Sequence, residues 1–216
     1  MSVITAIVAS PRKPGRFDLL VDGRHEVTLS IEAIERLGLV VGRGYDALRE
    51  QVEREAAVLA TYDRALNLLA LRARSSRELR RQLVRKGESP DDVDAAIGRL
   101  HAAGFLDDSA FARQFTRSKA VGAGMSRRRI QQELARRGVS REVSDGAIAD
   151  VFEEEQLDEA TVVEQAARKK LRGLENLDAE TRKRRLFAFL ARRGYDLDDI
   201  KRAMQAVGGG EIDAAR

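Results

Sequence analysis

The pattern of apolar and polar residues divides the chain into a short N-terminal segment and a longer helical part. Apolar and polar residues alternate in VITAIVAS at 3–10 and in RFDLLVDGRHEVTLS at 16–30, and both segments are rich in β-branched side chains. This pattern predicts strands, and Asp22-Gly23 between two apolar runs predicts a hairpin turn. A short helix over IEAIERLG is expected to follow, with Ser30 as its cap.

From Tyr45 onward, apolar residues recur at intervals of three and four, which is the spacing of amphipathic helices. One pattern occurs three times in this part: SSRELRRQLVRKG at 75–87, SRRRIQQELARRG at 126–138 and RKRRLFAFLARRG at 182–194. In each copy, two apolar residues four positions apart lie on one helix face. A basic pair and a glycine follow, and the glycine can end the helix in the left-handed conformation. The matching positions are Leu79, Ile130 and Leu186, then Leu83, Leu134 and Leu190, then Gly87, Gly138 and Gly194.

A helix before and a helix after each copy complete a unit of three helices. Such units, repeated in tandem, stack on their neighbours in a line. The expected fold is therefore mainly α, with tandem three-helix repeats in an elongated, solenoid-like array behind a small N-terminal β-hairpin/helix segment. The expected divisions are an N-terminal hairpin, short helix and linker helix at 1–60, repeat 1 at 61–107, repeat 2 at 108–158, repeat 3 at 159–207 and a disordered tail at 208–216.

Composition limits the class of protein. Of the 216 residues, 43% are hydrophobic and 34% charged, and no apolar run approaches the ~20 residues that a membrane-spanning helix needs. There is no cysteine, which excludes disulfides and thiolate metal sites. The apolar start has no basic residue before it, unlike a signal peptide. We expect a cytoplasmic protein.

No group of residues has the pattern of a catalytic or cofactor site. The two histidines, His25 and His101, have no partner pattern, and no glycine-rich phosphate-binding loop occurs. Paired acids such as Asp107-Asp108 lie at expected helix starts, where capping explains them. We therefore expect no enzyme activity, no cofactor and no metal site.

Charged residues are unevenly distributed, although the net charge is only +4. Residues 181–194 carry six basic and no acidic side chains, whereas residues 151–159 carry five acidic and no basic ones. A basic stripe is typical of a surface that meets a polyanion or an acidic protein. The alternative is a solvated helix face with local ion pairs, and the cations at the end of each repeated helix also suit its dipole.

The segment GFLDDSAFA at 104–112 is the most specific motif. The expected roles are a helix end at Gly104, packing between adjacent repeats for Phe105 and Leu106, a helix cap at Asp107 or Asp108, and burial for Phe111. The motif resembles the junction between the first and second repeats in the RecX family of bacterial regulators of the RecA recombinase. The segment at 65–87 is similar to the family's first repeat, with Ala73 where a proline is common. The resemblance covers about residues 60–207, and in repeat 3 only the helix–glycine–helix half matches.

The resemblance implies a function without chemistry. A RecX protein is expected to bind the filament that RecA forms on single-stranded DNA and to inhibit its ATPase, strand-exchange and co-protease activities. It would thereby modulate DNA repair and the SOS response, acting as a monomer, with the RecA filament and its single-stranded DNA as partners and no membrane. The candidate partner-binding or DNA-binding residues are clustered cations on helix faces that the leucines leave free: Arg77, Arg80, Arg81, Arg127, Arg128, Arg129, Arg168, Lys169, Lys170, Arg182, Lys183, Arg184 and Arg185.

Two alternatives stay open at this point. A direct DNA-binding helix-turn-helix protein would have a similar basic helix and glycine turn. Its recognition helices would need polar side chains that contact bases, and only repeat 2 has them, at Gln131 and Gln132. Arginine richness favours phosphates over bases. The other alternative is a helical scaffold for an acidic partner, without nucleic acid.

The tandem array predicts an elongated molecule in solution. A compact globule of this length has a radius of gyration of ~17 Å. Small-angle X-ray scattering should give a clearly larger value, and a value near that of the globule would contradict the solenoid arrangement.

Overall fold

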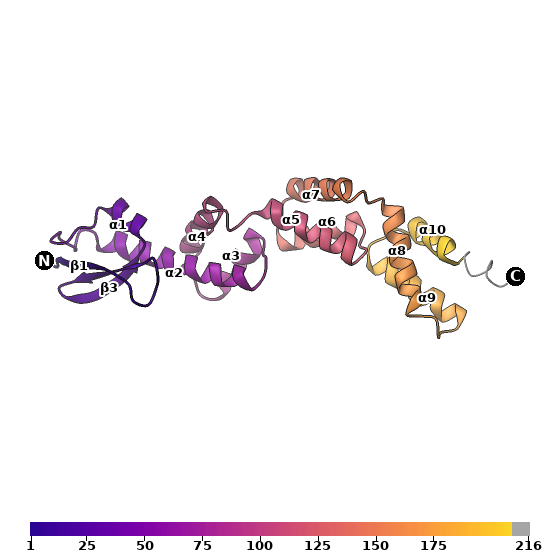
Figure 1. Cartoon of the computed structure of the whole chain (residues 1–216), viewed down its shortest axis with the longest axis horizontal. Coiled ribbons are helices and arrows are strands. Elements are labelled where there is room, and N and C mark those ends of the chain that lie inside the picture. The colour runs from indigo at the N-terminus through magenta and orange to yellow at the C-terminus, as the bar shows by residue number, and fades with distance from the viewer. Residues whose placement is uncertain (209–216) are drawn as a thin grey trace. The chain divides into compact units, whose positions relative to one another are not determined.

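The computed structural model describes residues 1–208, and the chain divides into two compact units, Met1–Leu106 and Asp107–Arg216. The first unit holds the N-terminal sheet and repeat 1, and the second holds repeats 2 and 3 (Figure 1). The expected mainly α fold of tandem three-helix repeats is confirmed. The tail expected at 208–216 lies outside the described residues from 209 onward, and Gly208 is the last residue of a helix.

The N-terminal residues form a three-stranded antiparallel sheet in the order β1 (Ile4–Ala9), β2 (Phe17–Val21) and β3 (Arg24–Leu29). Asp22 and Gly23 both have positive φ, 50° and 80°, and make the tight turn that the sequence predicts. Helix α1 (Ile31–Leu37) follows the sheet. The Ser30 hydroxyl caps this helix by accepting the Ala33 N–H at 3.3 Å.

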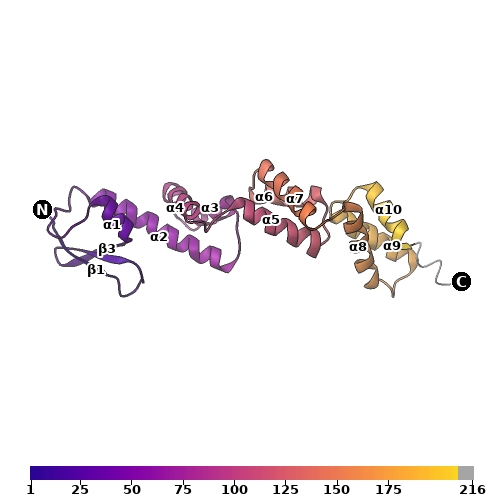
Figure 2. The ribbon, with the colours of Figure 1, turned by 45° about the horizontal axis from the view of Figure 1, so that its top comes forward.

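Helix α2 (Arg49–Leu71) belongs to both parts of the first unit (Figure 2). Its beginning packs on the sheet, where Val52 joins a core that includes Leu29. Its end is the first helix of repeat 1, where Ala65 packs with Leu79. The helix therefore runs without a break across the expected division between residues 60 and 61.

The three copies of the repeated pattern form equivalent helices. They are α3 (Ser76–Arg85), α6 (Arg127–Arg137) and α9 (Ala179–Arg192), and the helices after them are α4 (Pro90–Ala102), α7 (Arg141–Glu154) and α10 (Leu197–Gly208). The first helices of repeats 2 and 3 are α5 (Asp108–Arg117), which continues into a π-helical turn η1 (Ser118–Gly122), and α8 (Glu159–Arg172). The two apolar positions of each copy are at most 3% exposed. The glycines after them, Gly87, Gly138 and Gly194, have φ of 92°, 87° and 90°, which confirms the predicted left-handed helix ends.

The GFLDD motif ends repeat 1 and begins repeat 2. Gly104 follows α4 with a φ of 72°, and the Asp107 carboxylate caps α5. Leu106 is buried in the core of repeat 1, and Phe111 in that of repeat 2. Phe105 is 59% exposed, so the expected burial of its side chain between adjacent repeats is wrong. Phe105 follows the helix-ending Gly104 in a bend, where its N–H donates to the Leu100 carbonyl at 2.9 Å, and only the next side chain, that of Leu106, is buried.

Repeats 2 and 3 approach each other closely where α6 begins and α9 ends. The Ser126 N–H donates to the Arg193 carbonyl at 3.1 Å. A Cβ atom at Gly194 would lie 2.5 Å from the Cβ of Arg129. Glycine is therefore required at this position for the packing of two repeats as well as for its positive φ.

A buried carboxylate links the N-terminal part of the first unit to repeat 1. Glu55 on α2 is 9% exposed and accepts two hydrogen bonds from the Arg99 guanidinium, at 2.7 and 2.8 Å. Arg36 on α1 reaches the same carboxylate at 2.5 Å. Burial disfavours the charged form of Glu55, but Arg99 and Arg36 outweigh burial and lower the pKa of its carboxyl.

Loss of the Glu55 charge should destabilise the first unit. We expect Glu55→Gln to lower the free energy of unfolding by about 2–3 kcal/mol at neutral pH, because two guanidinium groups lose their partner. Denaturant titration measures the difference. The control is Glu50→Gln, which removes an exposed pair with Arg54 on the same helix and should cost less than about 1 kcal/mol.

The effect of Glu55→Gln should also depend on pH. The folded-state pKa of Glu55 lies below its ordinary value of 4.5, so its contribution is present above that pH and is lost as the pH falls through the folded-state value. The stability difference between wild type and variant should shrink over that acidic range. A loss no larger than that of Glu50→Gln at neutral pH would contradict the structural role of the carboxylate.

Gly194→Ala should destabilise the second unit more than Gly87→Ala destabilises the first. The φ angles are +90° and +92°, so alanine is strained at both positions by about 1–2 kcal/mol. Nothing lies within 4 Å of a Cβ at Gly87, whereas Arg129 and Ser126 obstruct one at Gly194. We expect this obstruction to add about 1–3 kcal/mol. Equal losses of unfolding free energy in the two full-length variants would argue against close packing of repeats 2 and 3.

Candidate partner-binding surface

The three candidate cations of repeat 1 lie on α3 and differ in their contacts. Arg80 donates two hydrogen bonds to the Asp94 carboxylate, at 2.6 and 2.9 Å. Arg81 lines a surface hollow together with Glu78. Arg77 is exposed and forms no ion pair with another described residue. Asp94 thus neutralises the charge of Arg80, whereas no described residue neutralises that of Arg77.

The candidate cations of α6 have partners within repeat 2 or, for Arg128, in repeat 3. The Arg127 guanidinium lies 4.1 Å from the centre of the Phe152 ring, a cation–π contact. Arg128 donates to the Gly194 carbonyl at 3.3 Å. Arg129 is half-buried and pairs with Glu133 at 3.2 Å. These arginines have structural partners, which the sequence pattern alone does not reveal.

The candidate cations of α8 differ in their surroundings. Arg168 is 3.9 Å from Glu164, a long ion pair between exposed side chains. Lys169 is exposed, and the Lys170 ammonium lies 5.5 Å from the centre of the Phe189 ring. Exposed pairs of this kind contribute little to stability, so the Arg168 charge stays accessible to a partner.

The candidate cations of α9 border an apolar groove in repeat 3, which we call the C-terminal groove. Its apolar lining is Leu171, Ala179, Leu186, Phe187, Met204 and Val207, and its cations are Arg182, Lys183, Arg184 and Lys201. Glu180 is the one acidic lining residue among those described. Arg185, the fourth cation of the α9 run, is exposed but is not among the lining residues. Phe187 is 37% exposed, so an aromatic side chain is available beside the cations.

A second hollow adjoins the C-terminal groove and extends its basic border. It is lined by Arg168, Leu171, Arg172, Glu175, Arg182 and Val207. Leu171, Arg182 and Val207 line both. Repeat 3 thereby brings together candidate cations of α8 and α9 that are 14 or more positions apart in the sequence.

Sequence reasoning missed three members of this surface, Arg172, Lys201 and Phe187. Arg172 and Lys201 stand outside the basic runs. Only the packing of α8 and α10 against α9 brings Lys201 to the C-terminal groove and Arg172 to the hollow beside it. The exposure of Phe187, by contrast, could have been predicted from its position in the sequence. This residue directly follows the core residue Leu186 and therefore points about 100° away from the core face of the helix.

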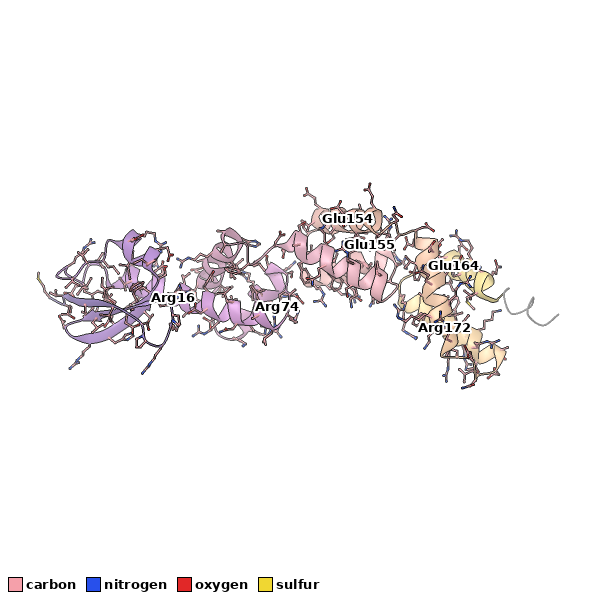
Figure 3. All side chains as sticks on the ribbon, viewed as in Figure 1. Arg16, Arg74, Glu154, Glu155, Glu164 and Arg172 are labelled. Carbon is pink, nitrogen blue, oxygen red and sulfur yellow. The ribbon has the colours of Figure 1, made fainter. Side chains whose placement is uncertain are left out.

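The acidic segment of repeat 2 is used for ion pairs within that repeat. Glu154 and Glu155 lie at the end of α7, where Figure 3 labels them. They form ion pairs with two arginines of α5. Arg113 contacts Glu154 and also Asp150, the latter at 2.6 Å. Arg117 bonds to Glu155 at 2.5 Å and to Glu154 at 3.0 Å. Here the alternative of solvated helix faces with local ion pairs explains the charge pattern.

The two histidines have neighbours that the sequence did not predict. His25 lies 3.5 Å from Asp18 and 3.3 Å from Thr28 on the sheet, and His101 lies 2.9 Å from the Ser76 hydroxyl. Within residues 1–208, no three histidine or acidic side chains are grouped as metal ligands would be. None of the helices in that range is long and apolar enough to cross a membrane.

Comparisons with known proteins agree with the repeat structure. Models of the first, second and third three-helix domains of RecX match residues 62–100, 107–148 and 158–204. A crystal structure of regulatory protein RecX has a TM-score of 0.73 at 20% identity, over 93% of this chain and 98% of that chain. RecX from Lactobacillus salivarius has a TM-score of 0.55 at 16% identity, over 70% of this chain and 97% of that chain. These two structures support the fold.

Curated relatives share more of the sequence. Regulatory protein RecX of Amycolatopsis mediterranei (strain U-32) is 40% identical over 129 residues, which cover 60% of this chain and 72% of the relative. Regulatory protein RecX of Clostridium botulinum (strain Eklund 17B / Type B) is 26% identical over 204 residues, which cover 93% of this chain and 94% of the relative. With all three domain models matched in order and such relatives covered over most of their length, the chain belongs to the RecX family.

Proposed function

We propose that this protein is a regulator that binds the RecA–single-stranded DNA filament and inhibits its ATPase, strand-exchange and co-protease activities. It would thereby modulate DNA repair and the SOS response, in the cytoplasm and as a monomer. Relatives from several bacteria carry the name of regulatory protein RecX, which supports the regulatory part of the proposal. The inhibition of the filament rests on the family resemblance and on the surface of repeat 3.

The C-terminal groove is the observation that carries the proposal. It combines an exposed aromatic side chain, Phe187, with cations such as Lys183 and Arg184 that have no ion pair within the described part of the chain. Aromatic residues and arginines are enriched in protein interfaces. A surface with both properties fits an acidic protein partner with apolar side chains better than it fits bare DNA, which offers mainly phosphates. We therefore place the main contact with the filament on repeat 3.

The structure of α6 disfavours the alternative of a DNA-reading helix-turn-helix protein. Gln131, one of two polar side chains that could contact bases, donates to Asp145 at 2.5 Å. Arg127 and Arg128 at the start of the helix contact Phe152 and Gly194. A recognition helix presents the residues of its N-terminal part to the base edges. In α6 those residues are engaged within the protein.

An ATPase assay tests the proposal. Wild-type protein at a concentration stoichiometric with RecA should inhibit ATP hydrolysis on single-stranded DNA. The double variant Lys183→Glu/Arg184→Glu should need roughly tenfold more protein for half inhibition, a loss of about 1.4 kcal/mol, because two attractive contacts become repulsive. The matched control is Arg12→Glu/Arg24→Glu, which makes the same charge change at exposed positions of the N-terminal segment and should inhibit like wild type.

The outcomes separate the function from its site. Absence of inhibition by wild type would reject the proposed function. Inhibition that is equally weakened in both double variants would mean that net charge, and not the C-terminal groove, determines binding. Tight, sequence-selective binding of the wild type to bare duplex DNA would instead favour the helix-turn-helix alternative.

A further inference from the structure

A cavity of about 170 Å³ lies between repeats 2 and 3, apart from the C-terminal groove. Residues 120–124, with their backbone and small side chains, form part of its wall. The rest comes from Leu157, from α8 with Val162 and Ala166, and from the end of α9. The volume is far above the ~10–15 Å³ that one water molecule needs. The cavity can therefore hold a small ligand.

Arg193, a partly buried residue, lines this cavity with an unpaired charge. Among the described residues, its buried Nη1 atom has no hydrogen-bond partner and no carboxylate forms an ion pair with its guanidinium. The Phe189 ring centre lies 4.3 Å from the guanidinium carbon, which provides one cation–π contact. Burial lowers the pKa of Arg193, yet a guanidinium stays protonated at neutral pH.

Two other partly buried arginines of this chain have a carboxylate partner. Arg99 bonds to Glu55 at 2.7 Å, and Arg129 bonds to Glu133 at 3.2 Å. A charge that is removed from water without a compensating partner destabilises the folded protein. The unpaired Arg193 in a cavity wall therefore calls for an anion that is not part of the protein.

Lys169 adds a second cation to the same cavity. It is exposed, lines the cavity and has no ion pair within the part of the chain that the structure describes. None of the described lining residues is acidic. The cavity is thus a site with two positive charges, one polar amide at Gln165 and otherwise apolar or backbone walls.

We propose that this cavity binds a phosphate group. Arg193 would donate its planar fork of N–H groups to the phosphate oxygens, and Lys169 would add a point charge. A phosphate monoester carries about two negative charges and three strong acceptor oxygens, which match two cations, whereas a carboxylate carries one charge. The phosphate comes either from free phosphate or from the backbone of a nucleic acid strand. Binding requires no recombinase, so this inference stands apart from the proposed function.

The position of the site couples the ligand to the packing of two repeats. The Arg193 carbonyl accepts the Ser126 N–H at 3.1 Å, and the Tyr195 hydroxyl donates to the Gly124 carbonyl at 3.2 Å. A phosphate held between Arg193 and residues 120–124 would contact both repeats at this junction. It should therefore stabilise the second unit against unfolding, as any ligand of the native state does.

Thermal unfolding of the full-length chain tests the site with inorganic phosphate as the probe. In a phosphate titration against chloride at constant ionic strength, the Tm of wild type should rise and saturate. The rise should be absent in Arg193→Met, which folds because it replaces an unpaired buried charge with an apolar chain of similar length. The matched control Arg192→Met removes the exposed neighbouring charge and should respond like wild type. Phosphate also stabilises proteins non-specifically, so an equal, unsaturated rise in all three proteins would overturn the proposal.

A second measurement does not depend on stability. The ³¹P resonance of inorganic phosphate should broaden or shift on addition of wild type and of Arg192→Met. The change should be several-fold weaker with Lys169→Met, an exposed substitution, and absent with Arg193→Met. An unchanged resonance with wild type, or the same response with Arg193→Met, would refute the site. A Tm rise with acetate that equals the rise with phosphate would likewise refute it, because a carboxylate would then be the ligand.

The source of the phosphate is distinguished by competition. If an oligothymidylate displaces inorganic phosphate from wild type, and its own affinity falls in Arg193→Met but not in Arg192→Met, the site takes a strand phosphate. If phosphate binds and the oligonucleotide does not compete, the site takes free phosphate or a small phosphate ester. Both results support a phosphate site.

Discussion

The left-handed glycine at the end of each repeated helix is the constraint on which the three repeats depend. Gly87, Gly138 and Gly194 have φ between 87° and 92°, a conformation that other residues adopt only with strain. This conformation ends one amphipathic helix and reverses the chain direction. The next helix can then pack its apolar face against the two buried aliphatic residues of the first. Gly194 has an additional role, since it leaves no room for a Cβ against Arg129. One residue type therefore sets both the fold of each repeat and the contact between two of them.

Features of the fold that depend on short stretches of sequence were predictable, and contacts between distant residues were not. The buried pair Leu79 and Leu83 and the helix end at Gly87 lie within nine positions, and their spacing alone determines one helix face. Glu55 and Arg99 are 44 positions apart, and nothing in the sequence pairs them. Amphipathic spacing indicates which face of a helix is polar, but the partner of each charge depends on how helices pack. The same limit explains why the candidate cations could be found and their partners could not.

The repeats differ in how their cations are compensated. In repeat 1, Asp94 neutralises Arg80, and in repeat 2 the acidic end of α7 neutralises Arg113 and Arg117. In both repeats the acidic residues belong to the helix that packs against the helix with the arginines: α4 against α3 in repeat 1, and α7 against α5 in repeat 2. In repeat 3 the partner helix α10 carries Lys201 toward the groove instead. The charge imbalance of the sequence therefore results in a local basic border beside exposed Phe187, and its placement on one repeat is what makes that repeat the proposed contact with the filament.

The first turn of α6 explains why its arginines looked like a DNA-binding feature. Arg127, at the first position of the helix, is followed by two more arginines, and this turn contains no acid, whereas α3 and α9 have Glu78 and Glu180 there. Cations at a helix N-terminus oppose the dipole by about 0.3–1 kcal/mol each. The negative charge that α6 lacks comes from repeat 3, where the Glu159 carboxylate accepts the Arg127 N–H at 3.0 Å. The positive first turn of α6 is thus tolerated because a carboxylate of the next repeat lies at the start of the helix. This contact accounts for the basic helix start without any bound DNA.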